Sequence, residues 1–126
     1  MDKKILVVED EKPLLDAIST KLEKSGFRVS MARSYEEAIL MLENGDVGAI
    51  WLDHYLMGQR DGLDIVVECK NENSPYREIP IFVVSNTASP DKVQKYIELG
   101  AVKYYIKAEK KLEDIISDIK SHLETI

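Results

Sequence analysis

Residues 49–62 read AIWLDHYLMGQRDG, and this stretch changes character at a single aspartate. The run from Ala49 to Leu52 is apolar and suits a protein interior, whereas a buried Asp53 carboxylate without a partner would be unfavourable. Aspartate is common where a strand passes into a turn, so local structure alone can explain Asp53. Its role depends on where the other polar residues of the chain fall relative to it.

Short apolar runs alternate with amphipathic helical patterns on both sides of this stretch. We predict strands over residues 4–8, 27–32, 48–52, 79–85 and 101–107. We predict helices over residues 13–24, 34–44, 63–70, 90–99 and 112–126. This alternation indicates an α/β fold, because parallel strands need helical crossovers that cover both faces of the sheet. The expected architecture is a flavodoxin-like (βα)5 doubly wound parallel sheet with strand order 2-1-3-4-5, forming one domain over residues 1–126.

Residues that favour helix ends support these boundaries. Ser34 and Glu37 have the spacing of a capping box at the start of the second helix. Ser89 before Pro90 suits the start of the fourth helix, and Gly100 suits its end.

The composition excludes several classes of protein. The 126-residue chain has a formal net charge of -6, so we expect no nucleic-acid-binding surface. No apolar run approaches the ~18 residues that a membrane span needs, and we expect no membrane association. Acids follow the first apolar run directly, which argues against a signal peptide.

Several residues with reactive side chains are expected to be structural. Cys69 is the single cysteine of the sequence, so we expect a reducing, cytoplasmic setting and a packing role for its thiol. His54 and His122 lack a second ligand at a metal-binding spacing, and we expect packing or surface roles for both. Tyr104 and Tyr105 alternate along a strand, so one ring should face the core.

Polar residues stand at the carboxyl ends of four predicted strands. Glu9 and Asp10 follow the first strand, and Asp53 follows the third. Ser85 ends the fourth strand, and Lys107 ends the fifth. Ligands of open parallel sheets bind beyond the carboxyl ends of the strands, and the expected order makes the first and third strands neighbours. We therefore expect the three carboxylates to converge, with Ser85 and Lys107 beside them.

Such a group of residues suits phosphoryl transfer assisted by a metal. Clustered carboxylates raise a pKa or recruit a cation, and oxygen ligands at a solvent-facing rim suit Mg²⁺. A carboxylate can attack a phosphoryl group to give an aspartyl phosphate, and this reaction needs mainly positioning and charge neutralisation. Each residue alone has a simpler explanation as a turn, cap or surface residue. Their occurrence at successive strand ends favours the chemical role.

Four motifs, occurring in order, carry a resemblance to a known family: KILVVEDE (4–11), IWLD (50–53), IFVVSNTAS (81–89) and ELGAVKYYIK (98–107). Over its whole length the chain resembles the receiver domain of two-component response regulators. The resemblance implies a phosphorylation-activated signalling switch that turns over no external substrate. It implies a sensor histidine kinase or phosphotransfer protein as phosphodonor and a downstream protein as target. It also implies a monomer or a weak homodimer, either standing alone or cut from a larger protein.

The resemblance assigns the acceptor and the metal ligands. Asp53 is the expected phosphoryl acceptor. Glu9, Asp10 and Asp53 are the expected ligands of Mg²⁺, or of Mn²⁺ in its place. Tyr55, two residues after the acceptor, is expected to offer its backbone carbonyl to the same metal.

The resemblance also assigns the residues of the switch. Ser85 takes the place of the family's switch hydroxyl, Lys107 that of its lysine, and Tyr104 that of its switch aromatic residue. On phosphorylation we expect Ser85 to approach the phosphoryl group and Tyr104 to move inward. The face made by the fourth helix, the fifth strand and the fifth helix should change as a result.

Two positions depart from the family pattern. Met57 replaces the proline that usually lies four residues after the acceptor, in a loop that is one residue longer. Ala108 replaces the proline that usually follows the lysine through a cis bond. A cis bond before another residue is unfavourable by about 2.5–4 kcal/mol, so we predict a trans bond between Lys107 and Ala108. Glu109 is then expected to cap the last helix or to hold Lys110.

Three alternative functions have features that can be compared with this sequence. A flavin- or nucleotide-binding module needs glycines after the first strand, where this chain has EDEKP (9–13). A phosphatase or phosphomutase with an aspartate nucleophile would carry Asp-x-Asp after the first strand, whereas Asp53 follows the third. A receiver-like adaptor that acts without phosphorylation agrees with the changes at Met57 and Ala108.

Overall fold

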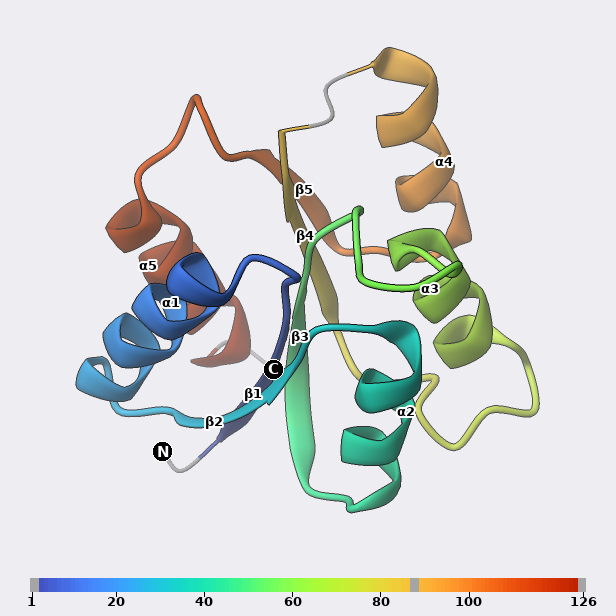
Figure 1. Cartoon of the computed structure of the whole chain (residues 1–126), viewed down its shortest axis with the longest axis horizontal. Helices are drawn as coiled ribbons and strands as arrows, with labels where there is room; N and C mark the ends of the chain where they lie inside the picture. Colours follow the sequence, from blue (N-terminus) through green and yellow to red (C-terminus); the bar gives the residue numbers. More distant parts are fainter. Residues whose placement is uncertain (1–2, 87–88, 125–126) are drawn as a thin grey trace.

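The computed structural model describes residues 3–86 and 89–124 (Figure 1). The strands are β1 (Lys4–Val8), β2 (Arg28–Ala32), β3 (Val47–Leu52), β4 (Ile81–Ser85) and β5 (Lys103–Ile106). The helices are α1 (Lys12–Lys24), α2 (Tyr35–Glu43), α3 (Gly62–Lys70), α4 (Pro90–Leu99) and α5 (Leu112–Glu124). Every predicted element is present, although the predicted end of the last helix at Ile126 lies outside the described residues.

The five strands form one parallel sheet in the order β2-β1-β3-β4-β5, which confirms the predicted fold class and strand order. β1 and β3 are neighbours, and their last residues, Val8 and Leu52, lie opposite each other. The residues that follow these two strands therefore emerge side by side at one edge of the sheet.

Helices cover both faces of the sheet, as Figure 1 shows, with α1 and α5 on one face and α2, α3 and α4 on the other. Successive residues of β3 point to opposite faces. Ala49 and Trp51 pack in the core beneath α1 and α5, whereas Ile50 and Leu52 pack in the core beneath the other three helices. Each fully buried large side chain contributes about 1.5–3 kcal/mol of hydrophobic stabilisation, so β3 is held firmly from both sides.

Some boundaries differ from those predicted by a few residues. β4 begins at Ile81 rather than residue 79, and β5 covers only residues 103–106. α3 begins at Gly62, because the Asp61 side chain accepts hydrogen bonds from the first turn and the Asp64 side chain accepts one from the Asp61 N–H. This reciprocal capping box was not anticipated from the sequence.

The predicted capping box of α2 was only half right. Ser34 Oγ accepts a hydrogen bond from the Glu37 N–H at 3.1 Å, as expected. The Glu37 carboxylate, however, accepts from the N–H of Arg33 at 2.8 Å, one residue before the cap. At the start of α4, Ser89 accepts from the Lys92 N–H as predicted, and Gly100 ends the helix with a φ of 116°.

The expected structural side chains are packed as predicted. Cys69 is fully buried, and burial raises the pKa of its thiol to about 11, so the thiol stays protonated. The His122 ring packs edge-on against Phe82 with 5.3 Å between centroids. Tyr105 faces the core beneath α1 and α5, whereas Tyr104 packs, partly buried, on the opposite side of the sheet.

Candidate functional site

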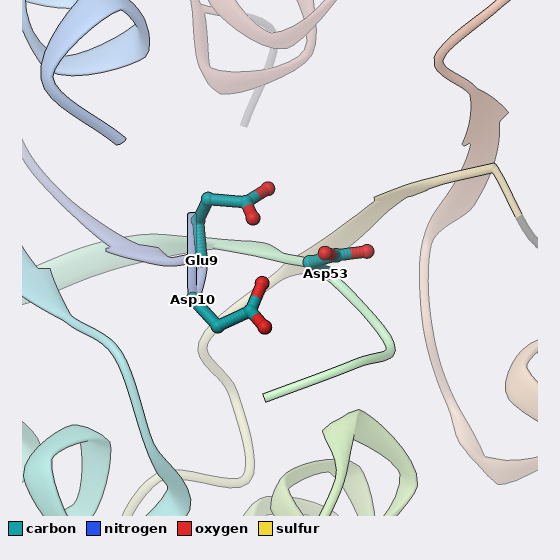
Figure 2. Close-up of side chains that lie close together, drawn as sticks. All are labelled: Glu9, Asp10 and Asp53. Atoms are coloured by element: carbon teal, nitrogen blue, oxygen red, sulfur yellow. The ribbon is translucent and has the colours of Figure 1, made fainter. Parts of the chain in front are cut away.

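Three carboxylates meet at the carboxyl edge of the sheet, where β1 and β3 end (Figure 2). Glu9 and Asp10 follow β1, and Asp53 follows β3. Backbone hydrogen bonds extend the sheet to this point, because the Asp53 N–H donates to Val8 at 3.0 Å and the Glu9 N–H donates to Ala32 at 3.0 Å. One carboxylate oxygen of each acid lies within 4.8 Å of the others, so the predicted convergence is confirmed.

Lys107 reaches the carboxylates from the end of β5. Its ammonium donates to Glu9 Oε1 at 2.7 Å and to Asp53 Oδ2 at 3.3 Å. Its own N–H donates to the Ser85 carbonyl at 3.1 Å, which fixes the backbone of Lys107 against the end of β4. The predicted lysine is therefore placed against both buried acids of the group.

Burial sets the ionisation of this group. Glu9 is 1% exposed, and burial, together with the charge of Asp53, raises the pKa of Glu9 to about 7 against the opposing effect of Lys107. Burial alone would lower the pKa of Lys107, but the hydrogen bond to Glu9 and the charge of Asp53 outweigh it, and the pKa is raised. A proton or a cation is therefore favoured beside Glu9 near neutral pH.

The carboxylates line an open cleft at the surface. The cleft holds every residue that was predicted from the strand ends, and Tyr55 from the loop after β3. Its lining residues are Glu9, Asp10, Glu11, Asp53, Tyr55, Ser85, Asn86, Ser89 and Lys107. Asp53 lines this opening, although its side chain is itself nearly buried.

The donor set of the cleft fits a hard divalent cation. Mg²⁺ prefers carboxylate, carbonyl and water oxygens, and it usually binds proteins through one or two carboxylates. Both Glu9 oxygens already accept hydrogen bonds, one from Lys107 and one from the Glu11 N–H. Asp10 is more exposed than Glu9 and Asp53, so its carboxylate is the most available ligand of the three.

Ser85 and Tyr104 lie next to each other at the ends of β4 and β5. Ser85 is 1% exposed at the end of β4, and its side chain hydrogen-bonds the Tyr104 hydroxyl. The Tyr104 ring is partly buried and packs against Tyr96 of α4 with 5.6 Å between centroids. Tyr104 is thus already directed inward in this structure.

The two departures from the family pattern lie at the rim of the cleft. The structure has no cis peptide bond within the described residues, so the Lys107–Ala108 bond is trans, as predicted. The Ala108 N–H donates to the Asn86 side chain at 2.9 Å. The expectation for Glu109 was wrong in one respect, because Lys110 pairs with Asp118 of α5 at 2.8 Å instead.

The loop after β3 joins the loop after β2. The Met57 N–H donates to the Arg33 carbonyl at 3.0 Å, and Ser34 and Met57 form a parallel bridge. The Arg33 guanidinium in turn donates to the Asp10 carbonyl at 2.9 and 2.6 Å. Arg33 therefore fixes the backbone of a predicted metal ligand, a role that sequence reasoning missed because arginine in a loop carries no such signal.

His54 occupies a buried position directly after Asp53, beyond the end of β3. It is 3% exposed, which confirms the packing role expected for it. Its Nδ1 lies 2.6 Å from the Tyr96 hydroxyl, and its Nε2 lies 3.0 Å from the Lys92 ammonium. A lysine ammonium has no acceptor, so Nε2 must accept and Nδ1–H must donate to Tyr96. This neutral form agrees with the pKa of His54, which burial lowers.

Comparison with known proteins points to one family. The family model for the response regulator receiver domain matches residues 5–120. A CheY-like receiver domain protein from Methanospirillum hungatei is 23% identical with a TM-score of 0.88, covering 99% of this chain and 96% of that one. A two-component response regulator from Clostridium difficile is 23% identical with a TM-score of 0.87, covering 97% and 96%. A Francisella response regulator receiver domain is 20% identical with a TM-score of 0.86, covering 98% of both chains.

None of the helices in the described part of the chain combines the length and the apolar character that crossing a membrane requires.

Proposed function

Because the chain belongs to the family of response regulator receiver domains, we propose that it is a signalling switch that accepts a phosphoryl group on Asp53. The observation that carries this proposal is the position of Asp53. Its carboxylate lies at the bottom of an open cleft, with two further carboxylates beside it and Lys107 3.3 Å away. A carboxylate held in this way can attack phosphorus, while the cations around it neutralise the charge that collects on the phosphoryl oxygens.

Glu9, Asp10 and Asp53 would hold Mg²⁺, or Mn²⁺, with the backbone carbonyl of Tyr55 as a further ligand. When bound, the metal would supply charge neutralisation for the phosphoryl oxygens. Lys107 binds the other side of the same group and holds Asp53 in place. Arg33 fixes the backbone at Asp10, so this ligand is positioned before the metal arrives.

Ser85 and Tyr104 would change their hydrogen bonds when Asp53 is phosphorylated. Ser85 lines the cleft and also hydrogen-bonds Tyr104, so its hydroxyl can exchange one partner for the other. A Ser85 hydroxyl that turns to a phosphoryl oxygen releases the Tyr104 hydroxyl. The face made by α4, β5 and α5 then differs between the two states, which is what a downstream protein needs in order to discriminate them.

Members of this family exchange phosphoryl groups with histidine kinases or phosphotransfer proteins and act on downstream targets. We assign the same classes of partner to this chain. A phosphohistidine donor would enter the open cleft, where Asp53 attacks phosphorus and the bond from phosphorus to the donor nitrogen breaks. No external substrate is consumed beyond the phosphodonor.

The direct test is phosphorylation with a small phosphodonor. We expect acetyl phosphate with Mg²⁺ to add one phosphoryl group to the wild-type chain, detected by intact-protein mass. Asp53→Asn should abolish the added mass while the far-UV circular dichroism spectrum stays unchanged. Undiminished incorporation in that variant would overturn the assignment of Asp53. No incorporation by the wild type, together with no binding of beryllofluoride, would favour the phosphorylation-independent adaptor instead.

A further inference from the structure

Helix α4 is attached to the rest of the molecule through very few side chains. Of its ten residues, Tyr96 alone is fully buried, and the others are exposed or partly buried. Its ring packs between His54 and Tyr104, with 5.7 and 5.6 Å between centroids. The position of α4 therefore depends heavily on what holds Tyr96.

The polar end of Tyr96 is bound by His54, which is adjacent to Asp53 in the sequence. Lys92 lies one helical turn before Tyr96, on the same side of α4. Its ammonium binds the other ring nitrogen of His54 at 3.0 Å. Two successive turns of α4 are therefore held by the two nitrogens of one buried imidazole.

His54 is connected to Asp53 through more than the peptide bond. The His54 N–H donates to Asp53 Oδ1 at 2.8 Å, so the side chain of Asp53 is bound by the backbone that carries the imidazole. The His54 carbonyl accepts from the Gly62 N–H at 2.8 Å, which ties the same residue to the start of α3. A change in the charge or position of the Asp53 side chain therefore acts directly on the backbone of His54.

The space around this contact is built to a close fit. A Cβ atom at Gly62 would lie 2.6 Å from the Tyr96 hydroxyl and 2.7 Å from the Asp53 carbonyl oxygen. The absence of a side chain at Gly62 thus permits Tyr96 to reach His54. Asp61, 3.7 Å from His54 Nε2, faces the same nitrogen as Lys92.

We propose that His54 is a positioning residue that holds α4 to the acceptor strand through Tyr96 and Lys92, and that it transmits changes at Asp53 to α4. The proposal rests on the proposed function of Asp53 and deepens it. It adds a path through the residue after the acceptor, separate from the path through Ser85 and Tyr104. The two paths meet on α4, because Tyr96 contacts both His54 and Tyr104.

The holding role can be tested in the resting protein, without any phosphodonor. We expect His54→Leu, and the milder Tyr96→Phe, to increase the hydrogen-exchange rates of α4 amides by about threefold or more, while α5 amides stay within error. His54→Asn keeps a side-chain N–H donor near the position of Nδ1, so it should restore part of the protection. Equal exchange in α4 and α5 for all variants would overturn the holding role.

The transmitting role is tested with beryllofluoride and Mg²⁺, followed by NMR of the backbone amides. In the wild type we expect beryllofluoride to shift the amides near Asp53 and those of α4. In Tyr96→Phe and His54→Leu the shifts near Asp53 should persist, whereas the α4 shifts should fall to roughly half or less. The double variant should lose little more than His54→Leu alone, because Tyr96→Phe removes a contact that His54→Leu has already broken.

Tyr105→Phe is the matched control. It also removes one hydrogen-bonded tyrosine hydroxyl, here one that donates to Asp118 at 3.3 Å, but on the opposite face of the sheet. Its α4 exchange and its response to beryllofluoride should equal those of the wild type. A full α4 response in Tyr96→Phe and His54→Leu would overturn the transmitting role. Failure of the wild type to bind beryllofluoride would instead count against the proposed function, and the exchange experiment would still decide the holding role.

Discussion

Glu9 shows how the fold changes the chemistry of a single residue. Its side chain is buried beside Asp53, and its pKa is raised from 4.5 to about 7. The folded chain therefore binds this proton more tightly than the unfolded chain does. The contribution of Glu9 to stability is fully present below pH 4.5 and is lost as the pH rises through about 7.

This pH dependence of the contribution of Glu9 to stability leads to a prediction for the metal-free protein. In the presence of a chelator, the melting temperature of the wild type relative to Glu9→Gln should fall between about pH 5 and pH 8. The comparison with the variant cancels the effects of titrating groups that do not interact with Glu9. A difference that stays constant, or that grows with pH, would show that burial does not raise the pKa of Glu9.

The three carboxylates should also differ in their importance for metal binding. Mg²⁺ at 100 times its dissociation constant stabilises a native state by about 2.7 kcal/mol, and we expect a rise in melting temperature of the wild type. Asp10→Asn should reduce this rise more than Glu9→Gln, because both Glu9 oxygens already have protein partners. Thermal scans across a Mg²⁺ titration give the comparison, and the reverse order would contradict it.

Residue-level prediction from sequence succeeded where a residue's position in the site follows from its place at a strand end. Asp53 and Lys107 could be located because the carboxyl ends of parallel strands share one edge. The partner of His54 could not, since Tyr96 is 42 positions away and a buried tyrosine on a helix usually signals only packing. The role of Arg33 could not be predicted either, because its contact is to a backbone carbonyl, which any residue could supply.

At the scale of elements, the start of α3 depends on the absence of a side chain. Alanine has a higher helix propensity than glycine. A Cβ at Gly62, however, would lie 2.6 Å from the Tyr96 hydroxyl. We predict that Gly62→Ala lowers the free energy of unfolding by about 1–3 kcal/mol, because the loop after β3 and α4 must move apart. Urea unfolding measures the loss.

Gly48 in β3 provides the control for this substitution. A Cβ there would lie 3.4 Å from a flexible carbon of Lys3 and 3.5 Å from the Lys4 carbonyl oxygen, which are ordinary contacts. Gly48→Ala should therefore change stability by less than about 0.5 kcal/mol. Equal losses of stability at the two positions would show that the close fit around Gly62 is not the cause of the loss in Gly62→Ala.

Apolar patterns predicted all ten elements, including α4, whose apolar residues recur at helical spacing although Tyr96 is its one fully buried residue. The ends of the helices were predicted less accurately, since they depend on which backbone N–H a capping side chain binds. Glu37 had the right spacing to bind the Ser34 N–H but bound that of Arg33 instead, and Asp61 formed a capping box that ends in aspartate rather than glutamate. The backbone path of the loop before each helix determines which of these capping hydrogen bonds forms.

At the scale of the whole molecule, activation should be visible on one side only. Lys107 lines the cleft after β5, and Tyr104 of β5 links Ser85 in the cleft to Tyr96 of α4. Beryllofluoride with Mg²⁺ should therefore shift amides of α4, β5 and the start of α5. Amides of α1 and α2 away from the cleft should change little. NMR spectra of the two states provide the measurement, and changes confined to α1 and α2 would contradict the proposed output face.

The bridge between the loops after β2 and β3 bears on how this protein can be engineered. Met57 stands where related receivers usually have proline, and its N–H donates to Arg33 at 3.0 Å. Proline has no such hydrogen, so Met57→Pro should lower the free energy of unfolding by about 1 kcal/mol or more, whereas Met57→Ala should not. The midpoints of urea unfolding for the two variants give the answer.

Replacing unusual residues by the commonest residue of a family is ordinarily a reliable way to make a protein more robust. Here proline would remove the hydrogen bond that joins the loops after β2 and β3. The loop after β2 carries Arg33, whose guanidinium holds the backbone of Asp10 in place. For this protein the unusual methionine is the robust choice, and a stabilisation programme should leave it alone.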